Sequence, residues 1–352
     1  MGEVKKLSLE KDMYPAAAEA GLTFQEFLEA QDPSEKYLTD GGKETELSKL
    51  SAFERQLMAN DIKVGSADAS LVDSFFKTSS SSVLFPEYLS QQIQIGMRMG
   101  KMYAMISDVV SVTSNIEGGS YKSSEIDLDN TDLKHKRVAE GAAFPKATIR
   151  TKDKTIDLRK IGIEIDASYE AMRRMKANVL AAAMQVLGMR LSKDIVTEAI
   201  NVLVNGDGNS NPASNVNTAT SEALVYGDIL KLLLTAEEGF EFDSVIAPKA
   251  VMEKILTISE FRDPIVAANW LTKGELTTPL GMRLKISEGV AANKILAFNK
   301  TAGIEMLQER GAQLVEADKI INRQIEGSVV SKVVGFGKLF ANSAKIMSTV
   351  WS

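Results

Sequence analysis

The sequence predicts an α+β fold, and three patterns carry that prediction. Residues 116–157 form a long, heavily charged arm with too few apolar residues to bury itself. The arm leads into an alternating strand at 161–165 and then into one long helical pattern over 168–205. Beyond residue 213, short helical and strand patterns alternate. An arm and a helix of such length predict a subunit that completes its packing against other copies of itself.

The composition narrows the possible functions. Hydrophobic residues make up 44% of the 352 residues and charged residues 25%, which is ordinary for a globular protein. The net charge of −6 argues against a dedicated nucleic-acid binder, which needs a basic face, but not against a protein that encloses nucleic acid. Because the chain has no cysteine and only one histidine, His135, it cannot form disulfides, thiolate metal sites or two-histidine metal sites.

Residues 1–83 read as an N-terminal arm with short helices. Pro15 suits the first turn of one helix, and Thr23 with Glu26 and Ser51 with Glu54 form two capping boxes. Because short helices are marginal alone, these need a docking surface on this subunit or on a neighbour. The apolar residues predicted to make that contact are Phe24, Phe27, Leu28, Phe53 and Leu57.

The next segment contains a joint, a helix and a strand. The Thr78–Ser82 run is small and polar, which predicts a flexible joint. Pro86 favours a helix over 87–102, and Val109–Thr113 reads as a strand.

The charged arm changes sign half-way along its length. A hairpin would therefore place opposite charges side by side, and its length favours a projecting functional element over a plain loop. Its acidic residues include Glu117, Glu125, Asp127, Asp129 and Asp132, and its basic residues Lys134, Lys136, Arg137, Lys146, Arg150, Lys152 and Lys154. Those predicted to contact a neighbouring subunit are Glu125, Asp127, Asp129, Lys134, Lys136, Arg137, Lys146 and Arg150.

The long helical pattern follows a half-buried strand. Ser168 is its predicted cap, apolar residues recur from Met172 to Ala199, and Asn205-Gly206 ends it. The later elements form an α+β region of about 100 residues. They comprise helices at 228–238 and 249–256 and strands at 243–247, 281–287, 294–298, 312–317 and 325–340, the last broken by Gly335 and Gly337, before a final apolar segment at 344–350.

No motif supports catalysis or a cofactor. Asp207, Asn209 and Asn211 imitate the start of a calcium loop, but Pro212 stands where glycine is needed and Thr218 where a bidentate glutamate is needed. His135 lies between two lysines, which favours an exposed position over a catalytic one. We therefore expect no enzymatic activity, no cofactor and no metal.

The order of these parts resembles the major capsid proteins of tailed bacteriophages, which have the Hong Kong-ninety-seven-type fold. The resemblance covers residues 84–352. It rests on Leu84–Tyr88, the charged hairpin, the strand and long helix, Asn205–Pro212, Ser244–Ala250, Thr278–Leu284, Lys294–Phe298 and Val333–Ile346. Each motif is weak alone, and their order is what makes the match specific.

The resemblance implies named parts and a structural function. Residues 1–83 would be the N-terminal arm and 116–157 the extended loop. Residues 84–115, 158–212 and 305–338 would form the peripheral domain, with the spine helix at 168–205. Residues 213–304 and 339–352 would form the axial domain. Such subunits form hexamers and pentamers of an icosahedral head around double-stranded DNA.

Partners and location also follow from the resemblance. The subunit would be a homo-oligomer in the virion capsid, assembled in the host bacterial cytoplasm. Scaffold, portal and decoration proteins are possible partners, and no membrane is expected. Some relatives crosslink an arm lysine to an asparagine with help from a carboxylate on the last long strand. No Asp or Glu follows Glu326 here, so we predict shells without such crosslinks.

Two alternatives stay open at this stage. An encapsulin, a bacterial nanocompartment shell that holds an enzyme, has the same fold, although the long segment before Thr78 disfavours it. A soluble α+β enzyme with an unrecognised site is the other alternative.

Overall fold

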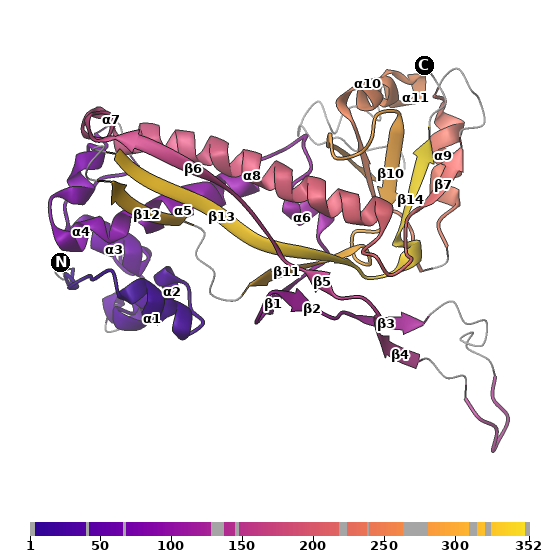
Figure 1. The fold of residues 1–352 in the computed structure, drawn as a ribbon, viewed down its shortest axis with the longest axis horizontal. Coiled ribbons are helices and arrows are strands. Elements are labelled where there is room, and N and C mark those ends of the chain that lie inside the picture. Colours follow the sequence, from indigo (N-terminus) through magenta and orange to yellow (C-terminus); the bar gives the residue numbers. More distant parts are fainter. Residues whose placement is uncertain are drawn as a thin grey trace. The chain divides into compact units, whose positions relative to one another are not determined.

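The computed structural model describes most of the chain. The described residues are 4–39, 42–65, 68–127, 137–144, 148–217, 224–237, 239–262, 281–309, 315–320 and 325–348. They divide into two units, one built from 1–99, 160–192 and 309–333 and the other from 100–159, 193–308 and 334–352. Each unit therefore combines segments that are distant in sequence (Figure 1).

The first unit is mainly helical, with strands from three parts of the chain. Helix α8 (Ala177–Asn205) and strand β13 (Ile325–Lys338) begin and end in different units and supply residues to both. The other elements are α1 (Met13–Glu19), α2 (Phe24–Gln31), η1 (Ser34–Tyr37), α3 (Ala52–Ala59), η2 (Val72–Phe76), α4 (Ser79–Ser82), α5 (Leu84–Arg98), β6 (Arg159–Ser168), α7 (Tyr169–Arg174) and β12 (Val315–Ile320).

Two long helices of the first unit approach each other very closely. A Cβ atom on Gly96 of α5 would lie 2.1 Å from the carbonyl oxygen of Gln185 in α8. A Cβ atom on Gly188 of α8 would lie 2.2 Å from the carbonyl oxygen of Ile93. Only glycine fits at both positions, and the Tyr88 hydroxyl adds a hydrogen bond of 2.8 Å to the carbonyl of Ala177.

The N-terminal segment docks on its own subunit. The Leu9 amide donates to the Ser80 hydroxyl at 2.8 Å, and the Tyr14 hydroxyl donates to the carbonyl of Val83 at 2.8 Å. The Tyr14 ring stacks on Phe24 with 4.1 Å between centroids. The sequence left open whether this segment docks on its own subunit or on a neighbour. The structure shows docking on its own subunit.

The second unit contains a five-stranded sheet in the order β7-β14-β10-β8-β9. Strands β10 and β14 are antiparallel, with Leu296 opposite Ile346, while β7 and β9 each pair in parallel with their neighbours. The bounds are β7 (Ser214–Asn217), α9 (Tyr226–Leu234), β8 (Ser244–Ala247), α10 (Lys249–Thr257), α11 (Ser259–Arg262), β9 (Arg283–Ile286), β10 (Lys294–Phe298), η5 (Ala341–Ser343) and β14 (Ala344–Ser348).

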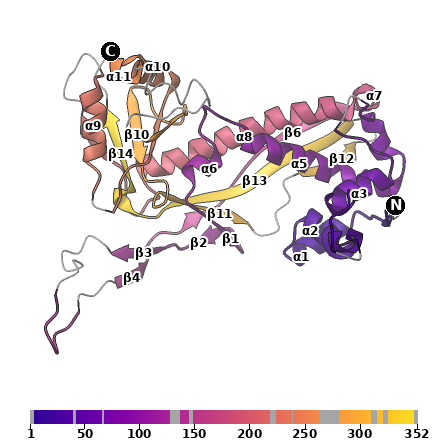
Figure 2. The same cartoon turned by 180° about the vertical axis from the view of Figure 1, so that it is seen from behind.

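Side chains from this sheet and its helices share one core. Leu232 of α9, Met252 of α10, Leu284 of β9 and Met347 of β14 are all buried in it. Figures 1 and 2 show α9, α10 and α11 around the strands. The sequence predicted only an apolar segment over 344–350. In the structure this segment forms strand β14 between β7 and β10, because its apolar side chains, including Met347, are buried in the core.

The second unit also contains the extended hairpin and the strands at its base. Strand β11 pairs with the C-terminal part of β13, with Ile304 opposite Lys338, and its other neighbour is β1. The elements are α6 (Ile106–Val109), β1 (Val112–Ile116), β2 (Ser120–Tyr121), β3 (Ser124–Asp127), β4 (Thr148–Thr151), β5 (Ile156–Asp157) and β11 (Ile304–Glu309).

Several local predictions need correction. The polar run at 79–82 is a helical turn capped by Thr78, because serines supply their own caps, and is not an unstructured joint. Residues 106–109 are helical, so the following strand starts at Val112 rather than Val109. The long helix is interrupted at Met175-Lys176, where Met175 has extended backbone and the chain pairs with Leu71.

Candidate inter-subunit site

The extended hairpin is the candidate site, and the predicted hairpin is confirmed. Strands β2 and β5 pair antiparallel, and so do β3 and β4. Strands β3 and β4 lie side by side in Figure 2, and their register places Glu125 opposite Arg150, which is the one acid–base pair in the described part of the two strand pairs. Among the residues that the structure describes, β3 and β4 pair only with each other. A two-stranded ribbon of this kind is marginally stable in water.

The hairpin exposes apolar side chains. Phe144 is 80% exposed and Ile149 is 70% exposed. Large apolar groups at this exposure are ordinary when isolated; here one lies in strand β4 and the other four residues before that strand begins. Phe144 and Ile149 are therefore candidates for contact with a partner.

The predicted contact residues of the arm fall into three groups. Arg137 and Arg150 are exposed. Glu125 and Asp127 have places in the β3 backbone. The remaining predicted contacts, and the single histidine, lie outside the described residues: Asp129, Lys134, His135, Lys136 and Lys146.

The predicted apolar contacts of the N-terminal segment lie inside the first unit. Phe27 is half-buried, and the other four are buried there: Phe24, Leu28, Phe53 and Leu57. The same unit buries an arginine, Arg55, whose Nε donates to the Asp32 carboxylate at 3.1 Å and whose guanidinium lies 4.7 Å over the Tyr37 ring. Their contact with a neighbouring subunit stays a prediction.

A buried ionic network holds the base of the hairpin. Lys152, directly after β4, forms a 2.9 Å ion pair with Asp207, and the two side chains are 2% and 1% exposed. The Lys152 ammonium also donates to the carbonyl of Lys338 at the end of β13. The Lys338 ammonium donates to the carbonyls of Leu203 and Asn211 at 3.2 and 2.9 Å.

Charge in this network is unbalanced, because two lysines share one carboxylate. Burial lowers the pKa of Lys338 to about 8, with Asp207 opposing that shift and Lys152 adding to it. Burial by itself raises the pKa of Asp207, but hydrogen bonds from Lys152 and Asn209 outweigh it, so the pKa lies below its ordinary value.

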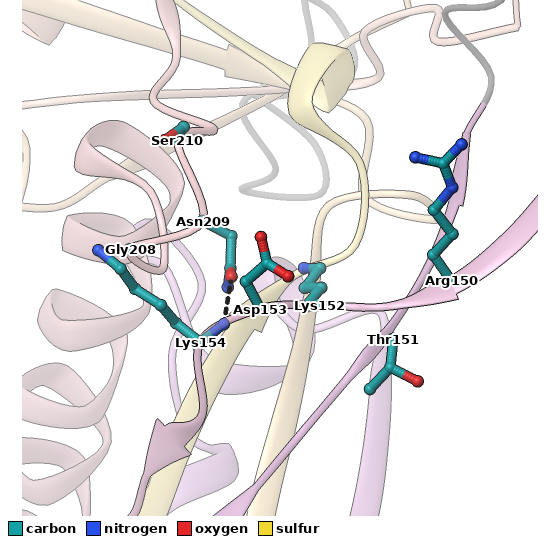
Figure 3. Close-up of a pocket in the computed structure, with 8 residues that line it drawn as sticks. All are labelled: Arg150, Thr151, Lys152, Asp153, Lys154, Gly208, Asn209 and Ser210. Atoms are coloured by element: carbon teal, nitrogen blue, oxygen red, sulfur yellow. Dashed lines mark hydrogen bonds between the residues drawn. The ribbon is translucent and has the colours of Figure 1, made fainter.

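A polar hollow of about 410 Å³ lies at the same place. Figure 3 shows Lys154, whose amide donates to the Asn209 side chain at 2.9 Å, and Arg150 on the side away from Gly208. The lining carries three cations and one carboxylate: Arg150, Lys152, Lys154 and Asp153. In the described part of the chain, no cluster of three metal-ligating side chains occurs.

Comparison with known families decides the identity. A family model described as phage capsid protein matches residues 151–337, which is just over half of the chain. The chain belongs to this phage capsid protein family. The predicted capsid function is thereby confirmed at the level of a capsid shell protein. A comparison with curated proteins found no match.

Solved structures resemble this capsid protein at low sequence identity. The capsid of a native GTA particle is 14% identical, with a TM-score of 0.51 over 71% of this chain and 92% of that one. A chain from Mycobacterium phage Bobi is 11% identical, with a TM-score of 0.47 over 73% of this chain and 93% of that one. The SrpI encapsulin from Synechococcus elongatus PCC 7942 is 14% identical, with a TM-score of 0.44 over 67% and 84%. The capsid protein has the predicted Hong Kong-ninety-seven-type α+β fold.

Sequence reasoning missed the network at the base of the hairpin. Asp207 was weighed only as an imitation of a calcium ligand, and Lys152 only as one of many arm charges. The available clue was the dense run of Asp and Asn after the helix, because such side chains bind their own backbone and shape loops.

No helix in the described ranges is long and apolar enough to cross a membrane.

Proposed function

We propose that this capsid protein forms hexamers and pentamers of an icosahedral head that encloses double-stranded DNA. Its work is structural rather than enzymatic, and it is located in the virion capsid after assembly in the host bacterial cytoplasm. The observation that carries the proposal is the hairpin, whose strands β3 and β4 pair only with each other among the described residues and whose Phe144 and Ile149 side chains are exposed. Scaffold, portal and decoration proteins are the expected further partners.

The domain roles belong to this proposal. Residues 1–83 act as the N-terminal arm and 116–157 as the loop that lies over a neighbour. Residues 84–115, 158–212 and 305–338 act as the peripheral domain, and 213–304 with 339–352 as the axial domain. The residues proposed to touch a neighbouring subunit are those predicted from the sequence, with the exposed hairpin side chains carrying most of the contact.

The test is assembly with and without the hairpin. We expect the full chain, expressed alone or with a scaffold, to form capsomers or shells in light scattering and negative-stain images. Deletion of residues 121–146 should leave a folded subunit that forms no stable shells, because the neighbour loses its contact. A monodisperse monomer from the full chain at all concentrations would refute the proposal, as would normal shells from the deletion.

The contents of the shells separate the remaining alternative. Nuclease-protected DNA in particles from infected cells supports a phage head. Shells that enclose a protein and no DNA would point instead to an encapsulin-type nanocompartment.

A further inference from the structure

We propose that the buried network of Lys152, Asp207 and Lys338 fixes the direction in which the hairpin leaves the second unit. These are positioning residues for the contact with a neighbouring subunit. The role of the hairpin as a contact with a neighbouring subunit rests on the proposed function. The network itself is observed in the structure. The ion pair of 2.9 Å ties the return strand of the hairpin to the loop after α8. The bond from Lys152 to the carbonyl of Lys338 ties the same strand to β13.

The loop that binds Lys152 is held in its conformation by hydrogen bonds of its own. The Asp207 amide donates to the Asn211 side chain at 3.1 Å, and Gly206 has a left-handed φ of +83°. Both the amide and the side chain of Asn209 donate to one Asp207 oxygen, at 3.1 and 3.0 Å. The other Asp207 oxygen accepts from Lys152 and from the Lys338 amide. The carboxylate therefore has one orientation, and Lys152 meets a fixed acceptor.

The strand after Lys152 is held by shape as well as by charge. A Cβ atom on Gly337 of β13 would lie 2.5 Å from Cδ1 of Ile156, so glycine leaves the space that Ile156 fills. Ile156 is buried with Leu307 of β11. The two glycines predicted to break the last strand therefore make room for the base of the hairpin instead.

The outgoing strand has a weaker attachment of its own. The Ser123 hydroxyl lies 3.4 Å from the buried Glu305 carboxylate of β11, which also accepts a hydrogen bond from Ser114. The Lys152 amide donates to the carbonyl of Ser123 at 2.9 Å and links the two strands. Because the charged anchor lies on the return strand, the loss of Lys152 should loosen the whole base.

An ionic anchor controls direction better than an apolar one of equal size. Each lysine bond needs a particular donor–acceptor geometry, whereas apolar contacts tolerate sliding. Buried ion pairs contribute little net stability compared with apolar replacements, so the retention of one here fits a role in specifying geometry. The network is thus expected to govern hairpin direction more than subunit stability.

The experiment measures hairpin direction in the subunit and assembly separately. The chain has no cysteine, so spin labels can be placed at Ile149→Cys on the hairpin and Thr301→Cys on the body of the second unit. We expect a narrow distance distribution between the two labels in the parent. After Lys152→Met the distribution should be about twofold broader, and the yield of shells should fall about tenfold. Lys154→Met, an exposed lysine two residues away, is the matched control and should change neither.

A double variant separates positioning from stability. Lys152→Met leaves Asp207 buried and unpaired, which destabilises the unit. Adding Asp207→Asn removes that charge and keeps an oxygen acceptor for the Lys338 amide. We expect the double variant to have a higher melting temperature than Lys152→Met alone, while the label distribution stays broad and shells stay few.

Either of two label results would overturn the proposal, and so would recovery of shells in the double variant. One is a distribution as narrow as the parent's after Lys152→Met, and the other is equal broadening by Lys154→Met. Recovery of shells in the double variant would show that the network acts through stability alone. If the parent forms no shells, the proposed function fails, yet the label distances still decide whether the network positions the hairpin.

Discussion

Each of the two units buries an ion pair and, besides it, an ionisable group whose pKa is shifted by burial. In the first, Arg55 is paired with Asp32, and a further carboxylate, Glu87, is buried with only a 3.3 Å bond from the Gln91 amide among its described hydrogen bonds. In the second, Lys152 is paired with Asp207, and the further buried group is a cation, Lys338. The first unit thus buries a glutamate beyond its ion pair, and the second buries a lysine next to its ion pair, besides the carboxylates of Asp228 and Glu305 elsewhere in that unit. The extra glutamate and the extra lysine are expected to respond oppositely to pH.

The largest expected difference is between removing the two carboxylates. Asp207→Asn leaves two buried lysines with no carboxylate, which should lower the free energy of unfolding of the second unit by about 3–5 kcal/mol. Asp32→Asn leaves Arg55 with Glu29 at 3.5 Å and with main-chain carbonyls, including that of Leu50, so the cost should be about 1–3 kcal/mol. Hydrogen exchange in peptides from each unit, followed in urea, measures both. Equal costs, or the reverse order, would break the comparison.

The buried glutamate should make the first unit more stable in mild acid. Burial raises the pKa of Glu87 to about 7, while the bond from Gln91 opposes the shift, and the nearby Tyr14 phenol is also buried. Between the ordinary pKa of about 4.5 and 7, the folded state holds a proton that the unfolded state has lost. Stability from this group is therefore full below pH 4.5 and lost as the pH rises through 7.

Lowering the pH from 8 to 5 should raise the unfolding free energy of the first unit by about 3 kcal/mol through this group. The measurement is hydrogen exchange in peptides covering α5. Glu87→Gln cannot ionise and should remove that part of the pH dependence. An unchanged pH profile in this variant would show that Glu87 does not carry the effect.

The buried lysine should make the second unit more stable in mild base. The folded pKa of Lys338 is about 8 against an ordinary 10.5, so between these values the unfolded state binds more protons. The cost of burying the charge is full below pH 8 and relieved as the pH rises. From pH 8 to 9.5 the gain should be about 2 kcal/mol in peptides covering β10 and β14.

Lys338→Met is the control for this effect and should flatten the profile, at the cost of its two bonds to carbonyl oxygens. Burial also lowers the pKa of Lys332 in the first unit. A comparison of the two units therefore does not identify the lysine responsible for the pH dependence, whereas Lys338→Met does. A flat profile in the parent chain would contradict the prediction.

Local patterns in the sequence predicted more of the first unit than of the second. Both capping boxes are present as expected, with Thr23 and Ser51 each accepting from the amide three residues on, and Ser168 caps α7. These interactions depend on neighbours in sequence. The close approach of Gly96 and Gly188, and the meeting of Lys152 with Asp207, join residues about 90 and 55 positions apart, and nothing local encodes them.

The same contrast applies to helix ends. Helix α10 of the second unit follows Pro248, which has no capping side chain, and its Lys249 amide donates instead to Glu288, 39 residues away, at 3.2 Å. The sequence predicted this helix from its apolar spacing and could not reveal its cap. The candidate site followed the same rule: the hairpin was predictable from its charge and length, and its anchor was not.

The smallest predicted effect tests whether helix α3 of the first unit is stabilised by its own cap or by packing against distant residues. The Ser51 hydroxyl accepts from the Glu54 amide at 3.3 Å, and the Glu54 carboxylate accepts from the Ser51 amide at 2.8 Å. Ser51→Ala should lower the unfolding free energy by about 1 kcal/mol, because one amide of the first turn loses its partner. Ser51→Thr keeps the acceptor and should cost only a few tenths of a kcal/mol. Exchange in α3 peptides is the measurement. A loss with Ser51→Thr as large as with Ser51→Ala would mean that the shape of the site, rather than the cap, holds the helix. The first unit would then depend on distant packing as much as the second.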